Sequence, residues 1–213
     1  MKKLLLFVLT TSLVSLGVAA EKEKEKFVLL TDGKSFAGWT GDTAKIWRIV
    51  DGAFVGGTIT EKVPRNEFLR TTRPYTNFVL RLQFKLVGTE GFVNGGVQVR
   101  SEPAKNPPNE MVGYQCDIGE GWWGALYDES RRNKVLIKPD AAAVAKAVKK
   151  GEWNEYLIRC EGRRIRTWIN GVVMIDYTEL DEKLPQHGLI GLQVHGGGKS
   201  EASYRNITVA ELP

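Results

Sequence analysis

The chain has 213 residues, with 30 basic and 25 acidic side chains and a formal net charge of +5. The basic residues are scattered rather than gathered into a stripe, so the composition does not indicate a nucleic-acid partner. We interpret residues 1–20 as a secretory signal peptide, because Lys2 and Lys3 precede an apolar stretch that ends in small residues. That stretch is short for a membrane span. We therefore expect an exported protein, periplasmic or extracellular, without a stable membrane anchor after signal cleavage.

Residues 21–26 form a charged leader, and residues 27–213 are predicted to form a single domain. About 190 residues are enough for one domain with a sizeable core. The sequence of this region contains neither a linker rich in Pro, Gly or Ser nor an internal repeat of fixed period. The sequence leaves the oligomeric state open.

Short runs of alternating apolar and polar residues recur between turn signals, which is typical of β-strands. We predict strands over residues 27–30, 47–50, 53–55, 68–70, 77–86, 95–100, 113–118, 153–160, 163–169, 172–177, 188–194 and 202–209. Asn170 and Gly171 predict a tight hairpin turn between two of them. The pattern favours an all-β fold, a two-sheet jelly-roll sandwich.

Three segments between and beside these strands differ from the rest. Residues 140–150 have a helical composition, with Asp140 as the N-cap and Gly151 after the end. Residues 101–110 and 119–138 are predicted to be long loops, and the second is unusually aromatic. Long loops in a compact domain often carry function.

Three predicted strands carry two polar residues at alternate positions: Gln98 and Arg100, Gln115 and Asp117, Gln193 and His195. Residues two apart on a strand point to the same face, so each strand presents its pair on one side and apolar residues on the other. One such strand is an ordinary half-solvated strand. Three of them predict a polar groove across one sheet.

His195 and Asp117 are the groups best suited to acid–base chemistry. His195 precedes three glycines, and a neutral imidazole accepts a proton near pH 7. Asp117 is interpreted as a base, a metal ligand or a hydroxyl acceptor, or as the ion-pair partner of Arg100 on a neighbouring strand. Glu67 lies either at the groove rim or on the surface. His187, the second histidine, is placed in a surface turn.

The aromatic loop supplies the groups that bind sugars. Trp122, Trp123 and Tyr127 lie beside the Gln, Arg and Asp strands, and sugar rings stack on aromatic faces while polar groups hold the hydroxyls. Glucanase-like sandwich enzymes of the retaining type need a carboxylate nucleophile. In the stretch of this chain that matches those enzymes, residues 115–120, Gln115 occupies the position of the nucleophile. The sequence therefore argues against retaining hydrolysis.

Cys116 and Cys160 are the two cysteines of the chain. Export allows a disulfide between them. Because both occupy the apolar phase of predicted strands, two buried free thiols are an equal alternative.

Five segments together resemble the 3-keto-disaccharide hydrolase domain family, formerly a domain of unknown function: FVLLTDGKSFAGWTG, NGGVQVRSE, GYQCDIGEGWWGALYDE, GEWNEYLIRCEGRRIRTWINGVVMIDY and GLIGLQVHGGGKSEASYRNITVAEL. The resemblance covers essentially the whole chain after the leader. It implies a concanavalin A-like, glucanase-like jelly roll. It also implies an exported carbohydrate-active enzyme that cleaves 3-keto-glycosides or 3-keto-disaccharides by base-assisted elimination or net hydrolysis.

The resemblance also implies roles for residues. Gln98 and Arg100 would hold the sugar or its developing enolate oxygen, and either His195 or Asp117 would be the base at C2. The other expected substrate-binding residues are Gln115, Gln193, Glu67, Trp122, Trp123 and Tyr127. Family members commonly have Ser or Ala at the position of Gly96 and Glu at that of Gln115. The sequence requires no cofactor, although a divalent metal held by His195, Asp117 and Glu67 is an alternative electrophile. A non-catalytic carbohydrate-binding module is the alternative function.

Overall fold

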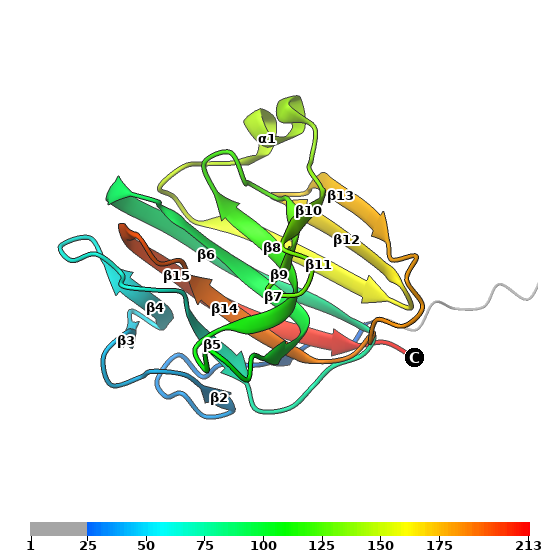
Figure 1. Cartoon of the computed structure of the whole chain (residues 1–213), viewed down its shortest axis with the longest axis horizontal. Helices are drawn as coiled ribbons and strands as arrows, with labels where there is room; N and C mark the ends of the chain where they lie inside the picture. Colours follow the sequence, from blue (N-terminus) through cyan, green and yellow to red (C-terminus); the bar gives the residue numbers. More distant parts are fainter. Residues whose placement is uncertain (1–24) are drawn as a thin grey trace, which may run out of the picture.

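The computed structural model describes residues 25–213 as a sandwich of two antiparallel sheets (Figure 1). The signal peptide predicted over residues 1–20 and most of the leader lie outside the described residues. Among the described residues, none of the helices has the length and apolar character needed to cross a membrane.

The first sheet follows the order β13-β12-β11-β6-β15-β4-β3, and β1 pairs with β15. Its strands are β1 (Val28–Leu29), β3 (Trp47–Val50), β4 (Ala53–Thr58), β6 (Phe78–Gly91), β11 (Asn154–Glu161), β12 (Arg164–Ile169), β13 (Val172–Thr178) and β15 (Gly198–Glu211). We call it the back sheet. The long central strands β6 and β15 pair along most of their length, because both alternate buried and exposed residues.

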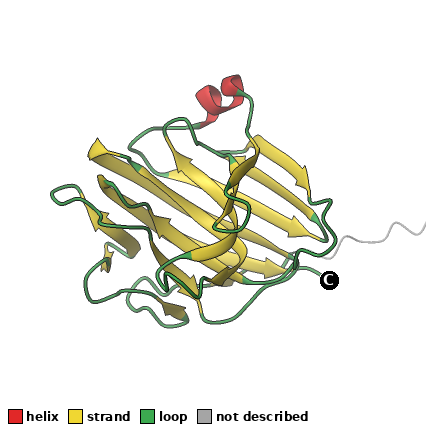
Figure 2. Ribbon diagram, viewed as in Figure 1, coloured by secondary structure: helices red, strands yellow, loops and turns green. Residues whose placement is uncertain are grey.

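The second sheet follows the order β10-β9-β8-β7-β14-β5-β2. Its strands are β2 (Trp39–Thr40), β5 (Glu67–Thr71), β7 (Asn94–Pro103), β8 (Met111–Gly119), β9 (Leu126–Glu129), β10 (Lys134–Ile137) and β14 (Leu189–Val194). We call it the front sheet. Figure 2 shows that strands make up nearly all of the regular structure.

Every strand predicted from the sequence corresponds to a strand of the structure, with bounds that differ by a few residues. The prediction of one long loop over 119–138 is wrong, because β9 and β10 form a hairpin there. The prediction for 101–110 is wrong at its start, because β7 runs on to Pro103. The helix α1 (Ala141–Ala147) is confirmed, with Asp140 accepting hydrogen bonds from two backbone amides, but it ends before the predicted Lys150.

The core lies between the sheets and is formed by the inward residues of both. Val97 on β7 and Cys116 on β8 pack there against back-sheet residues such as Ile158. Tyr204 reaches across from β15, and its hydroxyl donates to the Gln193 carbonyl at 2.6 Å. The residues alternating with Val97 and Cys116 must therefore face outward from the front sheet. Because of this alternation, the polar residues of the candidate site lie on the outward face of the front sheet.

Candidate functional site

The outward face of the front sheet carries the polar residues that alternate with the core. Along β8, Gln115 and Asp117 alternate with Cys116. Gln98 on β7 pairs with Gln115, and Tyr127 on β9 pairs with Gln115 from the other side. Direct cross-strand partners share a face of the sheet. The predicted groove across these strands is therefore present on β7, β8 and β9.

A hollow of about 210 Å³ lies on this face. Its lining combines two carboxyl groups and an imidazole with amide and aromatic side chains: Phe92, Asn94, Gln115, Asp117, Trp122, Tyr127, Glu129 and His195. We call it the front hollow. Clefts of mixed aromatic and polar lining are the usual form of small-molecule sites.

Asp117 lies at the floor of the front hollow and is 3% exposed. Its Oδ1 accepts a hydrogen bond from Gln115 Nε2 at 2.9 Å, whereas its buried Oδ2 has no protein partner. Burial raises the pKa of Asp117 well above its usual range, and the charge of Glu129 raises it further. A raised pKa favours the neutral form of a carboxyl group, which can donate a hydrogen bond.

His195 follows β14 and presents its ring to the same hollow. Its Nδ1 lies 2.6 Å from the Gly196 carbonyl, which only accepts, so Nδ1 carries the proton and Nε2 keeps a free lone pair. Phe92 packs edge-on against the imidazole, with 4.6 Å between ring centroids. Burial lowers the pKa of His195, so the imidazole is neutral near pH 7. Nε2 of His195 can therefore act as a base.

Glu129 is the second carboxyl group of the front hollow, and sequence reasoning missed it. Burial raises the pKa of Glu129 to about 7, helped by the charge of Glu110. The predicted loop over residues 119–138 assigns no face to the residues that alternate there. Tyr127 and Glu129 are two apart on β9, and this spacing was the signal that would have placed both on the outward face.

The structure does not bring Arg100 into the front hollow, which corrects the prediction. The pairing of β7 with β8 shifts register after Val99, and Arg100 has a positive φ of 50°. This bulge turns the side chain away from the outward face. The buried guanidinium instead donates to the Thr76 carbonyl at 2.7 Å and the Gly162 carbonyl at 2.5 Å, both on the back-sheet side. Arg100 thus ties the two sheets together.

The neighbours Trp122 and Trp123 separate into different environments. Trp122 lines the front hollow and meets Tyr127 edge-on at a centroid distance of 5.9 Å. Trp123 is 8% exposed and stacks on Phe84 of β6 in the core. The structure therefore does not bring Trp123 into the front hollow, because its indole packs against Phe84.

The remaining predicted site residues lie on or beside this sheet but do not line the front hollow. Gln98 is fully buried next to Gln115. Gln193 is also buried, and neither atom of its amide has a protein partner. Glu67 forms an ion pair with Arg65 at 2.8 Å.

The set of His195, Asp117 and Glu67 is not assembled as a metal site. Within residues 25–213, no group of three or more His, Cys, Asp or Glu side chains is arranged to hold a metal ion.

Cys116 and Cys160 are buried free thiols in the structure, so no disulfide joins them. Burial raises the pKa of both thiols.

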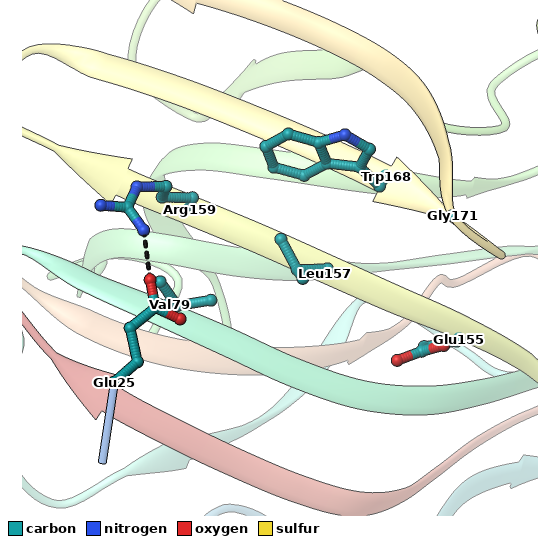
Figure 3. Close-up of a pocket in the computed structure, with 7 residues that line it drawn as sticks. All are labelled: Glu25, Val79, Glu155, Leu157, Arg159, Trp168 and Gly171. Atoms are coloured by element: carbon teal, nitrogen blue, oxygen red, sulfur yellow. Dashed lines mark hydrogen bonds and ion pairs between the residues drawn. The ribbon is translucent and has the colours of Figure 1, made fainter. Parts of the chain in front are cut away.

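A second hollow, of about 280 Å³, lies on the outer face of the back sheet (Figure 3). Trp168 and Leu157 form its apolar side, and an ion pair joins Arg159 Nη1 to Glu25 Oε1 at 2.5 Å. Arginine paired to a carboxylate does not transfer protons near neutral pH. The front hollow, with its neutral histidine and raised carboxyl groups, is therefore the better candidate for chemistry.

The two sheets define a glucanase-like jelly-roll sandwich, and the front hollow lies on the outward face of one of them. The chain belongs to the family of the 3-keto-alpha-glucoside-1,2-lyase-like domain, whose family model matches residues 26–210. The family resemblance drawn from the sequence is confirmed. Membership supports a carbohydrate-acting enzyme of the glycosyl hydrolase-like kind. A comparison with curated proteins finds no match.

Solved structures confirm the fold. A protein from Parabacteroides distasonis, provisionally named a glycosyl hydrolase, is 20% identical, with 88% of this chain and 94% of that chain covered and a TM-score of 0.64. A carbohydrate-binding module from Bacillus subtilis is 14% identical, with 82% and 96% covered and a TM-score of 0.62. The β-glucanase of Bacillus licheniformis is 9% identical, with 91% and 100% covered and a TM-score of 0.53. The jelly-roll sandwich predicted from the sequence is therefore confirmed.

Proposed function

We propose that this protein cleaves 3-keto-glycosides by base-assisted β-elimination, and that addition of water to the product gives net hydrolysis. The observation that carries the proposal is the front hollow, where a neutral imidazole and two carboxyl groups of raised pKa line one cavity. Family membership supports the substrate class. This chemistry needs a base and hydrogen-bond donors but no carboxylate nucleophile, so Gln115 is compatible with it.

His195 is the base of the proposed reaction. A ketone at C3 of the sugar acidifies the proton on C2. Nε2 of His195 takes that proton, and the C–H electron pair forms an enolate with its negative charge on the C3 oxygen. The enolate then expels the oxygen substituent of C1, so that a C1–C2 double bond forms in conjugation with the C3 ketone. Water adds at C1 of this enone to give the free 3-keto-sugar.

Asp117 is the hydrogen-bond donor to the C3 oxygen, in place of Arg100. We assign the donated proton to Oδ2, which is buried but has no protein partner, because Oδ1 is occupied by Gln115 Nε2. Charge develops on the C3 oxygen only in the transition state, where a donor in a desolvated site is most effective.

Glu129 is the acid that protonates the departing C1 oxygen. A carboxyl group with a pKa of about 7 is protonated in a useful fraction at neutral pH and still transfers its proton readily.

Trp122 and Tyr127 supply the aromatic surface against which the apolar face of a sugar ring packs. Export to the periplasm or beyond the cell is part of the proposal and rests on residues 1–20.

The test is incubation of the purified protein, without residues 1–20, with 4-nitrophenyl 3-keto-glucoside and with a 3-keto-disaccharide. We expect release of the C1 substituent from both, and a loss of kcat/KM of about 100- to 10,000-fold in His195→Ala, because a general base contributes that much. His187→Ala is the matched control and is expected to keep full activity, because His187 is exposed and lies outside the strands.

Absence of turnover with every 3-keto-sugar, with and without added divalent metal, would remove the proposal. Glycan binding that persists in His195→Ala and Asp117→Ala but fails in Trp122→Ala would instead identify a carbohydrate-binding module. Hydrolysis of unoxidised β-glucans would indicate a glycosidase of another mechanism.

A further inference from the structure

Asp117 stands at the end of a chain of hydrogen bonds that begins outside the front hollow. Ser101 Oγ donates to Gln98 Oε1 at 2.6 Å, Gln98 Nε2 donates to Gln115 Oε1 at 2.9 Å, and Gln115 Nε2 donates to Asp117 Oδ1 at 2.9 Å. Ser101 and Gln98 are buried and do not line the hollow. All three hydrogen bonds point toward Asp117.

The same atoms allow the chain to run in the opposite direction. A primary amide presents an acceptor on one side and a donor on the other, and a half-turn of the amide group exchanges them. After such a half-turn, Gln115 Oε1 accepts a proton held by Asp117 Oδ1, and Gln115 Nε2 donates to Gln98 Oε1.

The far end of the chain is satisfied in this reversed direction as well. Gln98 Nε2 then donates to Ser101 Oγ, and the Ser101 hydroxyl donates to the Val99 carbonyl, which lies 3.0 Å away. No buried polar group along the chain loses its partner in either direction. Leaving such a group unpaired would be costly, so reversal is feasible because every relay atom keeps a partner except Asp117 Oδ2, which lacks a protein partner in both directions.

We propose that Gln98 and Ser101 are positioning residues that form a reversible amide relay behind Asp117, which keeps its carboxyl group hydrogen-bonded in both protonation states. A backbone amide or an arginine in the same place would donate only, and would favour the charged carboxylate alone. The relay instead accommodates a carboxyl group that must hold a proton and give it up. Its catalytic meaning rests on the proposed function.

In the proposed reaction the relay direction follows the substrate. When the C3 oxygen of a bound sugar accepts the proton on Asp117 Oδ2, the relay runs toward Oδ1 and stabilises the charge that develops on the carboxyl group. Without substrate, Oδ2 has no protein partner, and the reversed relay lets Oδ1 carry the proton and donate it to Gln115. Gln98 and Ser101 therefore act through Gln115, not on the sugar.

Other titratable and charged groups surround Asp117 and contribute to its proton affinity. They come from both sheets and from the loops: Cys116 on β8, Glu129 on β9, Lys138 after β10, Tyr156 on β11, His195 after β14 and Tyr204 on β15. None of these is part of the relay. A test must therefore read out Gln98 itself rather than only the pH dependence of Asp117.

The first test is side-chain NMR of the protein without substrate between pH 4 and pH 10. We expect the carbonyl carbon and amide nitrogen of Gln98 to shift with the same midpoint as the carboxyl carbon of Asp117, although the two residues do not touch. Gln83, which bonds to Arg205 and Asn206 on the back sheet, is the control and does not follow that midpoint. A Gln98 signal that stays constant over this range overturns the relay.

The second test uses variants of the full domain. Gln98→Met keeps the length of the side chain and removes both polar atoms, and Ser101→Ala removes the hydroxyl. Each is expected to lower kcat about ten-fold with KM changed less than two-fold and with a displaced pH profile, and Ser101→Thr restores the wild-type values. Ser203→Ala, at a buried serine of β15, is the matched control.

The two tests separate the relay from the proposed function. If Gln98 titrates with Asp117 but no 3-keto-sugar is turned over, the relay stands and the proposed function fails. If turnover is observed but Gln98→Met and Ser101→Ala have wild-type kcat and pH profiles, the relay is overturned and the proposed function stands.

Discussion

Two buried acids on neighbouring strands of the front sheet have opposite surroundings. Asp128 on β9 is fully buried and accepts hydrogen bonds from Arg131 Nε at 2.8 Å and from Arg132 Nε. Asp117 on β8 is almost as buried, but it has one amide partner and an oxygen without any. Burial alone therefore does not identify a functional acid. What distinguishes Asp117 is burial beside a hollow with incomplete pairing.

The surroundings of Asp128 extend into an ion-pair cluster at the sheet edge. Arg132 also binds Glu179 at 2.6 Å, and the hydroxyls of Tyr114 and Tyr177 donate to the same carboxylate. Burial by itself would raise the pKa of Glu179, but these donors, Arg132 first, lower it to about 2. Every charge in this cluster is compensated, as expected of a structural site, whereas the front hollow leaves groups open to a ligand.

The largest expected effect is the loss of stability in Asp128→Ala. Removal of one partner leaves the charges of Arg131 and Arg132 without their buried carboxylate, which typically costs about 3–5 kcal/mol of unfolding free energy. Urea unfolding at pH 7 measures it, and kcat per folded molecule stays at the wild-type value. A stable but inactive Asp128→Ala protein would erase the distinction between the two acids.

Asp117 variants are expected to show the reverse pattern. Asp117→Ala loses the donor to the C3 oxygen, so kcat falls by about 100- to 1,000-fold, while the unfolding free energy changes by less than about 1 kcal/mol. Asp117→Asn keeps an N–H donor and loses only about ten-fold. Steady-state kinetics with a 3-keto-glycoside, beside urea unfolding, give both numbers. Equal losses in the two variants would contradict the role of Asp117 as a hydrogen-bond donor.

The variant Glu129→Gln is expected to change the pH dependence of activity. Activity requires neutral His195, whose pKa lies below 6.5, and protonated Glu129, whose pKa is about 7, so the wild-type kcat/KM profile is bell-shaped. Glu129→Gln is expected to lose about ten- to 100-fold in kcat for glycosides with poor leaving groups, together with the alkaline limb near pH 7. Substrates with good leaving groups are affected less, and an unchanged alkaline limb would assign that limb to another residue.

Glu129 also predicts a pH dependence of stability. Its pKa is raised in the folded state, so its contribution to stability is fully present below pH 4.5 and is lost as the pH rises through about 7. Because Glu129 is partly exposed, we expect this loss to be no more than about 2 kcal/mol. Thermal unfolding between pH 5 and pH 8 measures it, and the decline in Tm is smaller in Glu129→Gln.

The smallest expected effect separates the two adjacent tryptophans. Trp122→Ala removes an aromatic wall of the front hollow, worth about 1 kcal/mol, so KM rises about five-fold with kcat nearly unchanged. Trp123→Ala, its neighbour, leaves KM of the folded protein unchanged and lowers stability, because its indole packs on Phe84. A KM effect in Trp123→Ala instead would reverse their assignment.

The two-sheet sandwich could be predicted from the sequence alone, because the period of two along a strand follows directly from which side chains avoid water. It also placed Gln115 and Asp117 on one face of β8, with Cys116 on the other, since alternation within a regular strand is a local property. His195 reached the same hollow because its strand remained in phase with β7 through the pairing of Gln193 with Gly96.

Tertiary structure decided the rest. The bulge after Val99 turned Arg100 toward the back sheet, where buried carbonyls of distant segments required a donor, and no local pattern encodes those partners. Packing against Phe84 placed Trp123 in the core, whereas Trp122 lies in the front hollow. Pairing with β8 made the segment that contains Glu129 a strand. These outcomes depend on contacts between residues far apart in the sequence, so periodicity within one segment could not reveal them.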